Sequence, residues 1–417
     1  MGRTLTLIEQ AENIKRASFI LGNANETLRN KTINQIAVEL ENNLQSILTA
    51  NKIDMERETK NGLPQSRLDR LMLNKERVLA ICSAVRDVAK LNDPLKCFGK
   101  EIARPNGMTI KKVCVPLGCV GMIYESRPNV TVDATILCIK SGNTALLRGG
   151  EEAHETNKEL VRVMKMALAK VGLPETCIEL VQDTSREIAT QMMKLDKHLD
   201  VLIPRGGAGL IRAVKENSTV PIIETGTGNC HVYVDEFADM KMALDILINA
   251  KVQRPSVCNS CESLLVHEKV AKEFLTMANA ELVKLGVEIR GCNKTQEHIK
   301  CGTATENDFE IEYNDLILSV KVVTDIDMAI EHINKYGTRH SECIVTNNTE
   351  NANKFLTTVD CACVYHNVST RFSDGFEFGF GAEIGISTQK LHARGPFAIN
   401  ELTTYKWVIV GNGQTRG

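Results

Sequence analysis

Two cysteines three residues apart, Cys258 and Cys261, stand in the stretch VQRPSVCNSCESLLV. A helical apolar pattern precedes them and a short apolar strand follows. A zinc site needs about four ligands, commonly from two such pairs, and the spacing of Cys361 and Cys363 does not supply a second pair. A thioredoxin-like pair lies in a turn that leads from a strand into a helix, which is a different order. We therefore expect no metal site, and either one nucleophile or two packed core cysteines.

Cys258 is the better candidate for a nucleophile. Pro255-Ser256 interrupts the helical pattern, and Ser256 could cap a new short helical turn that begins near Cys258. Backbone amides at such a position lower the pKa of a thiol from about 8.5 toward neutrality, and Arg254 adds positive charge. We expect Cys261 to pack inside the protein. A buried structural role remains the alternative for Cys258.

Glycine clusters give a second chemical signal. The stretch LIPRGGAGLIRAV places Gly206 and Gly207 between an expected strand and an expected helix. Exposed amides at a helix N-terminus favour an anion such as phosphate. The spacing differs from the dinucleotide fingerprint G-x-G-x-x-G, so a tight strand–helix turn is an equally good interpretation. The later cluster GFGAEIG follows no convincing strand, and we expect it to form a loop near a domain interface.

The elements that position these residues form two α/β series. Apolar residues at helical spacing predict helices over the first 90 or so residues. Short apolar strands then alternate with helices to about residue 235, where HVYV closes the series, and a second series begins near residue 243. This alternation predicts parallel, doubly wound sheets, which bind ligands at the carboxyl ends of their strands. We expect a last strand in TTYKWVIV.

Composition narrows the function classes. The chain has 417 residues, a formal net charge of −2 and 43% hydrophobic residues, which gives no electrostatic reason to expect nucleic acid or a membrane surface as a partner. No apolar stretch approaches the roughly 18 residues needed to cross a bilayer, and the N-terminal stretch does not resemble a secretory signal. The fourteen cysteines are therefore expected to be reduced thiols. We expect a cytoplasmic enzyme that acts on a small molecule.

The sequence resembles the γ-glutamyl phosphate reductase family of the aldehyde dehydrogenase superfamily in six blocks, from about residue 5 to the C-terminus. These blocks are VPLGCVGMIYESRPNVTVDA, GNTALLRGG, IPRGGAGLI, NAKVQRPSVCNSCESLLVH, STRFSDGFEFGFGAEIGISTQKLHARGP and LTTYKW. The resemblance implies an NADPH-dependent reduction of L-glutamyl 5-phosphate to L-glutamate 5-semialdehyde, with release of phosphate, in proline biosynthesis. It also implies a homodimer or a homotetramer.

The resemblance further implies an aldehyde-dehydrogenase-like α/β fold with two doubly wound domains and a small β element for oligomerisation. The cofactor-binding domain is expected to comprise residues 1–108 and 126–235, with parts of 369–394. The catalytic domain is expected at 236–368. The oligomerisation strands, which include Trp407, are expected at 109–125 and 395–417.

Catalytic roles follow from the same resemblance. Cys258 matches the catalytic cysteine of the superfamily, whose thiolate would attack the acyl phosphate before hydride reduces the thioester. Arg127 and Asn129 lie where relatives carry an oxyanion-stabilising amide, although an Arg-Pro turn is the alternative. Glu224 lies 34 residues before Cys258, at the position of a glutamate that activates water. A reductase must protect its thioester from water, so we do not assign Glu224 as a base. A hydrolytic aldehyde dehydrogenase that uses Glu224 remains the alternative function.

Binding roles complete the expected site. Arg148 stands where relatives place a lysine that contacts the adenosine ribose, and its guanidinium could bind the 2′-phosphate of NADPH, although two glutamates follow it closely. Gly226 could permit close approach of the nicotinamide, and Asp315 resembles the acid that holds the nicotinamide ribose. Arg254 and Arg371 are candidates for substrate binding, with Arg394 as an alternative for the substrate carboxylate.

Overall fold

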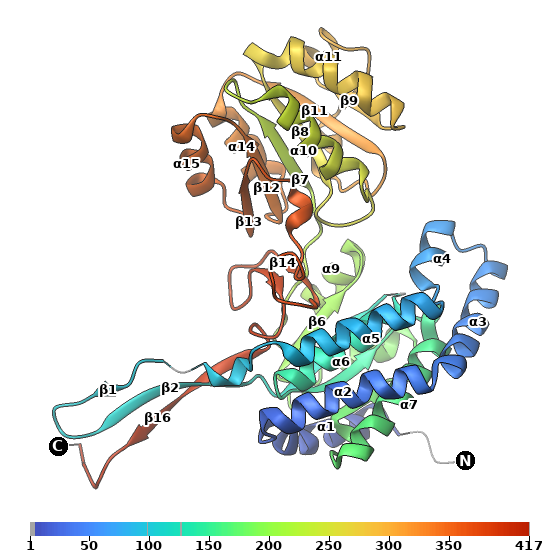
Figure 1. Ribbon diagram of the computed structural model, residues 1–417, viewed down its shortest axis with the longest axis vertical. Helices are drawn as coiled ribbons and strands as arrows, with labels where there is room; N and C mark the ends of the chain where they lie inside the picture. Colours follow the sequence, from blue (N-terminus) through green and yellow to red (C-terminus); the bar gives the residue numbers. More distant parts are fainter. Residues whose placement is uncertain (1–4, 98, 126, 417) are drawn as a thin grey trace. The chain divides into compact units, whose positions relative to one another are not determined.

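The chain folds into two compact units. The computed structural model describes residues 5–97, 99–125 and 127–416. Unit 1 comprises Met1–Glu224, Gly379–Gly385 and Phe397–Gly417, and unit 2 comprises Thr225–Phe378 and Ile386–Pro396 (Figure 1). The chain therefore passes between the two units four times.

Unit 1 begins with helices, as the apolar pattern predicts. Short polar side chains define their starts: Thr6 forms a capping box with Glu9, and the side chains of Asn25 and Asn74 accept hydrogen bonds from backbone amides of the helices that follow them. The helices are α1 (Leu7–Gly22), α2 (Glu26–Asn42), α3 (Leu44–Lys60), α4 (Gln65–Leu71) and α5 (Lys75–Lys90), followed by the 3-10 turn η1 (Pro94–Lys96).

A parallel four-stranded sheet forms the centre of unit 1, in the order β5-β4-β3-β6. All six residues of β3 are buried, as expected of a central strand that helices cover on both faces. The strands are β3 (Cys119–Tyr124), β4 (Thr144–Arg148), β5 (Ile178–Leu180) and β6 (Val201–Arg205). The connecting helices are α6 (Pro128–Lys140), η2 (Glu151–Ala153), α7 (His154–Val171), η3 (Glu175–Cys177), α8 (Arg186–Met192) and α9 (Ala208–Asn217).

Three antiparallel strands form an arm that extends from the helices of unit 1 (Figure 1). They are β1 (Ile102–Ala103), β2 (Thr109–Pro116) and β16 (Thr403–Val410). The β2–β16 ladder runs from Thr403 opposite Pro116 to Val410 opposite Thr109, and most of β16 is exposed. The expected grouping of 109–125 as oligomerisation strands was wrong for its second half, because β3 pairs with β4 and β6 inside the central sheet.

Unit 2 is built on a seven-stranded parallel sheet in the order β10-β9-β11-β8-β7-β12-β13. Alternate residues of one strand face different cores: Val232 and Val234 belong to one hydrophobic cluster and Tyr233 to another. The strands are β7 (Cys230–Val234), β8 (Cys261–His267), β9 (Glu288–Gly291), β10 (Gly302–Thr303), β11 (Ile317–Val323), β12 (Ser341–Val345) and β13 (Cys363–His366). The helices are α10 (Met240–Val252), α11 (Glu268–Lys284), α12 (Asn293–Gln296), α13 (Glu306–Glu310), α14 (Ile326–Tyr336), α15 (Thr349–Thr358) and η4 (Thr370–Phe372). Two short strands, β14 (Gly385–Ser387) and β15 (Gly395–Phe397), pair with each other.

The expectation that HVYV closes the first series was wrong. These residues belong to β7, which lies between β8 and β12 in the sheet of unit 2. The chain passes into unit 2 at Glu224–Thr225 rather than near residue 235. Alternation of strands and helices does not reveal which sheet a strand joins, and both neighbours of β7 come later in the sequence.

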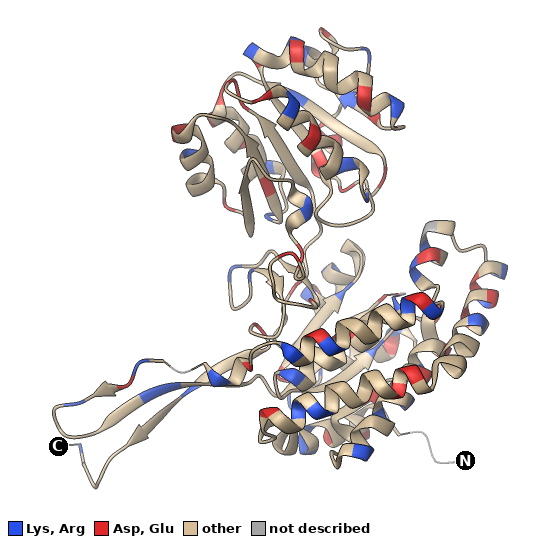
Figure 2. Ribbon diagram, in the orientation of Figure 1, with Lys and Arg blue, Asp and Glu red and all other residues tan. Residues whose placement is uncertain are grey.

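Charged residues are distributed over both units. Figure 2 shows Lys and Arg interspersed with Asp and Glu along the helices, consistent with the formal net charge of −2. In the part of the chain that the structure describes, no helix combines the length and apolarity needed to cross a membrane.

Candidate active site

Cys258 lies in a turn of unit 2 between α10 and β8. The residues from 253 to 260 form turns and bends, and the amide of Ser260 donates to the carbonyl of Val257. The expected helix start at Cys258 was therefore wrong, since the turn leads directly into β8. Cys258 is half-buried, whereas Cys261 is fully buried as the first residue of β8 and donates to the carbonyl of Ser263 at 3.3 Å. The predicted contrast between the two thiols is present.

The segment that leads into β7 packs against the backbone of Cys258. A Cβ atom built on Gly228 would lie 1.4 Å from the carbonyl oxygen of Cys258 and 2.7 Å from its Cα. Only glycine fits this close approach. The thiol of Cys230 donates to the same carbonyl oxygen at 3.2 Å. The position of the Cys258 peptide is thus set by direct packing against residues 228–230.

Hydrogen bonds with the segment around η4 also hold the Cys258 turn. The side-chain amide of Asn259 donates to the carbonyls of Arg371 and Ser373, at 3.2 and 3.0 Å. The hydroxyl of Thr370 donates to the carbonyl of Asn259 at 2.7 Å. These three bonds attach the 3-10 turn η4 to the residue that follows Cys258, and so bring Arg371 to the nucleophile.

Arg371 lies close to Cys258, and Arg254 lies close to Arg371. The pKa of Arg371 is lowered by burial and then by the positive charge of Arg254, while the negative charge of a Cys258 thiolate raises it. Arg254 and Cys258 are therefore both close enough to interact electrostatically with Arg371, although Arg254 itself is exposed. Arg371 Nε donates to the side-chain carbonyl of Gln253 at 3.0 Å. The positive charge of Arg371 near the Cys258 thiol favours a thiolate and an anionic ligand, and Arg254 adds a second positive charge near Arg371.

Arg394, the alternative for the substrate carboxylate, is bound elsewhere in unit 2. Its Nη2 lies 2.8 Å from Asp360 Oδ1, and Lys390 lies 2.9 Å from the other oxygen of Asp360. These cations lower the pKa of Asp360 to about 2, with Lys390 the largest cause. Arg394 thus helps fix the 386–396 segment, which leaves Arg254 and Arg371 as the substrate candidates.

A buried ion pair joins the two ends of the Cys258 turn. Lys251 Nζ, in the last turn of α10, lies 2.6 Å from Glu262 Oε2 in β8, and neither side chain is exposed to solvent. The other oxygen of Glu262 accepts from the backbone amide of Asn314 at 3.2 Å. Burial raises the pKa of Glu262 to about 7, against the opposing effect of Lys251. The residue types of the turn did not indicate this ion pair in the sequence.

Glu312, and not Asp315, binds the segment that packs against Cys258. Glu312 Oε1 accepts from the amide of Gly228 at 2.8 Å. Asp315 is exposed and its carboxylate accepts from the amide of the next residue, Leu316, at 2.8 Å. Gly226 donates to the carbonyl of Ile386 at 2.8 Å, and a Cβ there would lie 2.2 Å from the Cγ2 atom of Thr388.

In unit 1, Arg127 and Asn129 lie where β3 leads into α6. Arg127 is the N-cap residue of α6 in extended conformation and Pro128 is its first residue. Asn129 is exposed and its amide donates to Asp133 Oδ2 at 3.0 Å. Burial raises the pKa of Asp133 to about 7, opposed by Asn129 and Arg205. Asp133 lies one helical turn after Asn129, a spacing that could have indicated this acid.

The predicted cofactor residues of unit 1, Arg148, Gly206 and Gly207, lie at the carboxyl ends of β4 and β6. Arg148 Nη2 donates to the carbonyls of Thr184 and Ser185, the second at 3.1 Å, while its buried Nε has no hydrogen-bond partner in the described structure. Burial lowers the pKa of Arg148. An orphaned guanidinium nitrogen at a strand end fits an anionic ligand such as a nucleotide.

The glycine turn between β6 and α9 is engaged by a carboxylate. Gly207 is the N-cap residue of α9, and its amide donates to Glu125 Oε2 at 3.0 Å. A Cβ on Gly206 would lie 2.6 Å from the carboxyl carbon of Glu125. The amide of Gly207, which we expected to face a phosphate, faces the carboxylate of Glu125, the residue that follows the neighbouring strand β3.

Glu224, the alternative water-activating base, is the last residue of unit 1 before the chain enters unit 2. Its Oε1 lies 3.0 Å from Lys215 Nζ, and the Glu224 side chain is 21% exposed. The carboxylate therefore has a cationic partner on α9.

Comparison with known proteins places the chain in a family. The aldehyde dehydrogenase family model matches residues 70–308. The γ-glutamyl phosphate reductase of Caldicellulosiruptor saccharolyticus is 55% identical over 415 residues, which cover 98% of this chain and 99% of the relative. That of Clostridium perfringens is 54% identical over 411 residues, with coverage of 98% and 99%. The chain belongs to the γ-glutamyl phosphate reductase family. A crystal structure of such a reductase from Thermotoga maritima aligns with a TM-score of 0.96, 50% identity, and coverage of 99% of this chain and 100% of that one.

These matches confirm the resemblance read from the sequence blocks and the aldehyde-dehydrogenase-like α/β fold. The family is one of oxidoreductases, and its fold implies a nicotinamide cofactor. Among the described residues, no group of three or more His, Cys, Asp and Glu side chains is arranged to hold a metal ion.

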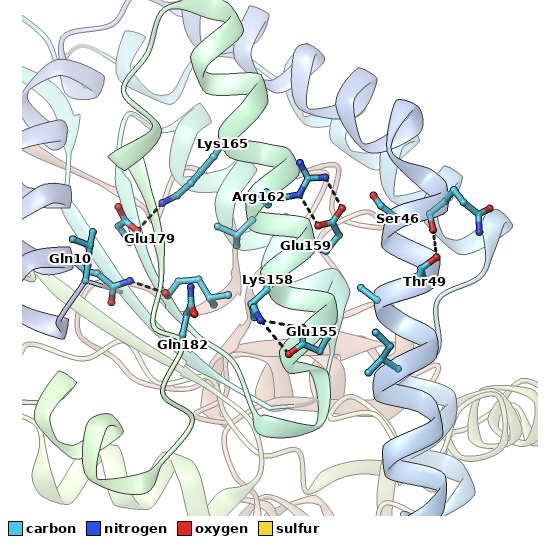
Figure 3. Close-up of a pocket in the computed structure, with 16 residues that line it drawn as sticks. Gln10, Ser46, Thr49, Glu155, Lys158, Glu159, Arg162, Lys165, Glu179 and Gln182 are labelled. Atoms are coloured by element: carbon cyan, nitrogen blue, oxygen red, sulfur yellow. Dashed lines mark hydrogen bonds and ion pairs between the residues drawn. The ribbon is translucent and has the colours of Figure 1, made fainter. Parts of the chain in front are cut away.

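A separate pocket of about 1010 Å³ lies in unit 1 among α1, α3, α7 and the end of β5 (Figure 3). Its charged side chains pair with one another, as Lys158 does with Glu155 and Lys165 with Glu179. The residues that line it include none of the site residues predicted from the sequence. We therefore assign this pocket no part in the chemistry.

Proposed function

We propose that the chain reduces L-glutamyl 5-phosphate to L-glutamate 5-semialdehyde with release of phosphate, using NADPH and a thioester on Cys258, as a step of proline biosynthesis. The observation that carries the proposal is the half-buried thiol of Cys258 in a turn attached to η4, with Arg371 close to it and Arg254 close to Arg371. Membership of a family whose curated relatives are named γ-glutamyl phosphate reductases supports the substrate.

In this proposal, the Cys258 thiolate attacks the acyl carbon of the acyl phosphate. A carbon–sulfur bond forms, the carbon–oxygen bond to phosphate breaks, and phosphate leaves. Arg371 and Arg254 bind the anionic substrate and stabilise the thiolate. When bound, NADPH supplies the hydride that reduces the thioester to the aldehyde.

Residues of unit 1 have separate proposed roles. Arg127 and Asn129 are proposed to stabilise the oxyanion, a contribution of roughly 3–4 kcal/mol for one donor. Arg148 is proposed to bind the ribose or 2′-phosphate of NADPH through its buried guanidinium, and Gly206 and Gly207 to approach the cofactor phosphates.

One change to the cofactor proposal follows from the geometry. We propose that Glu312, rather than Asp315, is the acid that holds the nicotinamide ribose, because Glu312 binds the amide of Gly228 in the segment that packs against Cys258. Gly226 remains a proposed point of nicotinamide approach, although a Cβ at that position would lie 2.2 Å from Thr388 Cγ2.

We further propose that the arm joins copies of the chain into a homodimer or a homotetramer. The exposed residues of β16, among them Trp407 at 51% and Ile409 at 55%, form an edge strand with apolar side chains. Such an edge is an established route to association between sheets.

The decisive experiment supplies glutamate semialdehyde and NADP⁺ with and without inorganic phosphate. The proposal expects NADPH to form only with phosphate, since phosphate must release the acyl group. Equal rates without phosphate would instead support the hydrolytic alternative with Glu224 as base. Cys258→Ser should abolish turnover while cofactor binding persists, and Cys261→Ser should have a mild effect.

The two arginines can be tested in the same assay. Arg371→Met removes a charge-assisted contact worth about 1.5–3 kcal/mol, so kcat/KM for the acyl phosphate should fall by roughly 10–150-fold. Arg394→Met is the matched control from the same unit, and its activity should fall far less.

A further inference from the structure

Cys97 and Cys114 lie opposite each other at the base of the arm in unit 1. The amide of Cys114 donates to the carbonyl of Cys97 at 3.2 Å, and the amide of Gly99 donates to the carbonyl of Lys112 at 2.9 Å. These two bonds define an antiparallel pairing in which Cys97 faces Cys114 as a hydrogen-bonded pair. The Cα atoms of such pairs are about 5.5 Å apart, within the range of about 4.4–6.8 Å that a disulfide spans.

The two thiols are in contact. Burial raises the pKa of Cys114, and so does its hydrogen bond with the Cys97 thiol. Cys97 is exposed and Cys114 is half-buried. All fourteen cysteines are among the described residues, and Cys97 is the one that is exposed. A thiol that solvent reaches thus touches a partner thiol that is oriented toward it.

We propose that Cys97 and Cys114 are an oxidation site that forms a reversible disulfide. With a low-molecular-weight disulfide as oxidant, the Cys97 thiolate attacks one of its sulfur atoms and releases the first small thiolate. The Cys114 thiolate then attacks the Cys97 sulfur of the mixed disulfide and releases the second. The two protein thiols lose two electrons and two protons, and the oxidant becomes two small thiols.

The cross-link would act on the arm. Cys114 lies in β2, and its partner on the other side is Tyr405 in β16. The bond would fasten the segment between residues 97 and 114, which contains the two-residue edge strand β1, to the central strand of the arm (Figure 1). Oxidation would therefore add a covalent bond to an edge of the arm that hydrogen bonds hold in the reduced protein.

Cys292 and Cys301 provide an internal control. They are also half-buried and close enough for charge interaction. The thiol of Cys292, however, pairs with the hydroxyl of Thr295 at 3.4 Å. We therefore expect no disulfide between Cys292 and Cys301 under conditions that oxidise the arm pair.

The test incubates the reduced full-length protein with oxidised glutathione, blocks free thiols with iodoacetamide and digests it with trypsin. Mass spectrometry should find the Cys97 peptide joined to the peptide that carries Cys114, and dithiothreitol should separate them. Cys119 and Cys138 share that peptide, because trypsin does not cleave the Arg127–Pro128 bond. The double variant Cys119→Ser with Cys138→Ser should therefore retain the cross-link. Cys114→Ser should leave Cys97 as a mixed disulfide with glutathione.

Three results would overturn the proposal. One is recovery of wild-type Cys97 in alkylated form after oxidation. Another is Cys97 held only as the glutathione adduct when Cys114 is present. The third is a cross-link that persists in Cys114→Ser, because the bond would then involve Cys119 or another cysteine.

Discussion

Gly228→Ala should disable the nucleophile although it adds a single methyl group. The new Cβ would lie 1.4 Å from the carbonyl oxygen of Cys258, and real Cβ atoms essentially never approach another heavy atom within 3.0 Å. The Cys258 peptide or the segment before β7 must therefore move by at least about 1.6 Å, the difference between these distances. Because a 1 Å misplacement of a reacting group can cost about 10²-fold in rate, we expect kcat to fall at least about 100-fold, or roughly 2.7 kcal/mol.

The assay pairs steady-state reduction of the acyl phosphate with the rate at which iodoacetamide alkylates Cys258. Gly302→Ala is the matched control in unit 2, since its nearest atoms lie at 3.5 and 3.8 Å, and it should behave like the wild type. Gly226→Ala offers a contrast, because its Cβ would meet the side chain of Thr388, and Thr388→Ala should restore what it loses. A Gly228→Ala enzyme with wild-type kcat and alkylation rate would refute the reasoning.

Three further predictions concern stability and assembly. Lys251→Met removes the partner of buried Glu262 and should cost about 3–5 kcal/mol at pH 8. The pKa of Glu262 in the folded protein, about 7, exceeds its unfolded value, so this acid lowers the stability of the protein as pH rises between the two values. Urea unfolding should therefore show a smaller deficit for Lys251→Met at pH 5 than at pH 8. The double variant Lys251→Met with Glu262→Gln should recover most of the lost stability. Burial lowers the pKa of His332 to about 2. The pKa of this base is lower in the folded protein than its unfolded value of about 6.5, so His332 lowers the stability of the protein as pH falls below about 6.5. His332→Gln should therefore reduce the loss of stability between pH 6.5 and 4. An unchanged acid-unfolding profile would count against this reasoning. Val408→Asp should lower the particle mass seen by light scattering if β16 joins copies of the chain, and an unchanged mass would exclude that strand as the contact.

Local pattern predicted most of the elements. The apolar repeat before residue 90 gave the N-terminal helices, and Gly172 ends α7 in the left-handed conformation that favours glycine. The strands TALLR and TTYKWVIV appear as β4 and β16. These features depend on residues adjacent in sequence, so they could be predicted from a single sequence.

Pairing between distant segments could not be read in the same way. HVYV looks like any buried strand, and its place beside β12 depends on residues more than 100 positions later. The turn at Cys258 is held by Gly228 and by η4 rather than by a local helix. Asp315 was predicted because it resembles the acid that holds the nicotinamide ribose, and the sequence did not indicate that Glu312 binds the amide of Gly228.

The engagement of Gly207 by Glu125 is a further case. The sequence predicted a phosphate near these amides, whereas the structure shows a carboxylate of the protein on the amide of Gly207. The carboxylate comes from the residue after β3, which pairs in parallel with β6. Neighbouring strand ends in a sheet therefore supplied the partner, and strand order is not visible in a linear motif.

The four passages of the chain between the units limit how far unit 1 can fold during synthesis on the ribosome. Leu402, near the end of the sequence, is fully buried in unit 1, and its carbonyl accepts from the Asn143 side chain at 2.8 Å. Unit 1 therefore cannot complete its interior until almost the whole polypeptide has left the exit tunnel, whereas its first 224 residues emerge long before. A nascent chain halted after Glu224 should expose apolar surface to proteases and chaperones, and splitting the gene at that point should not yield two independently stable halves.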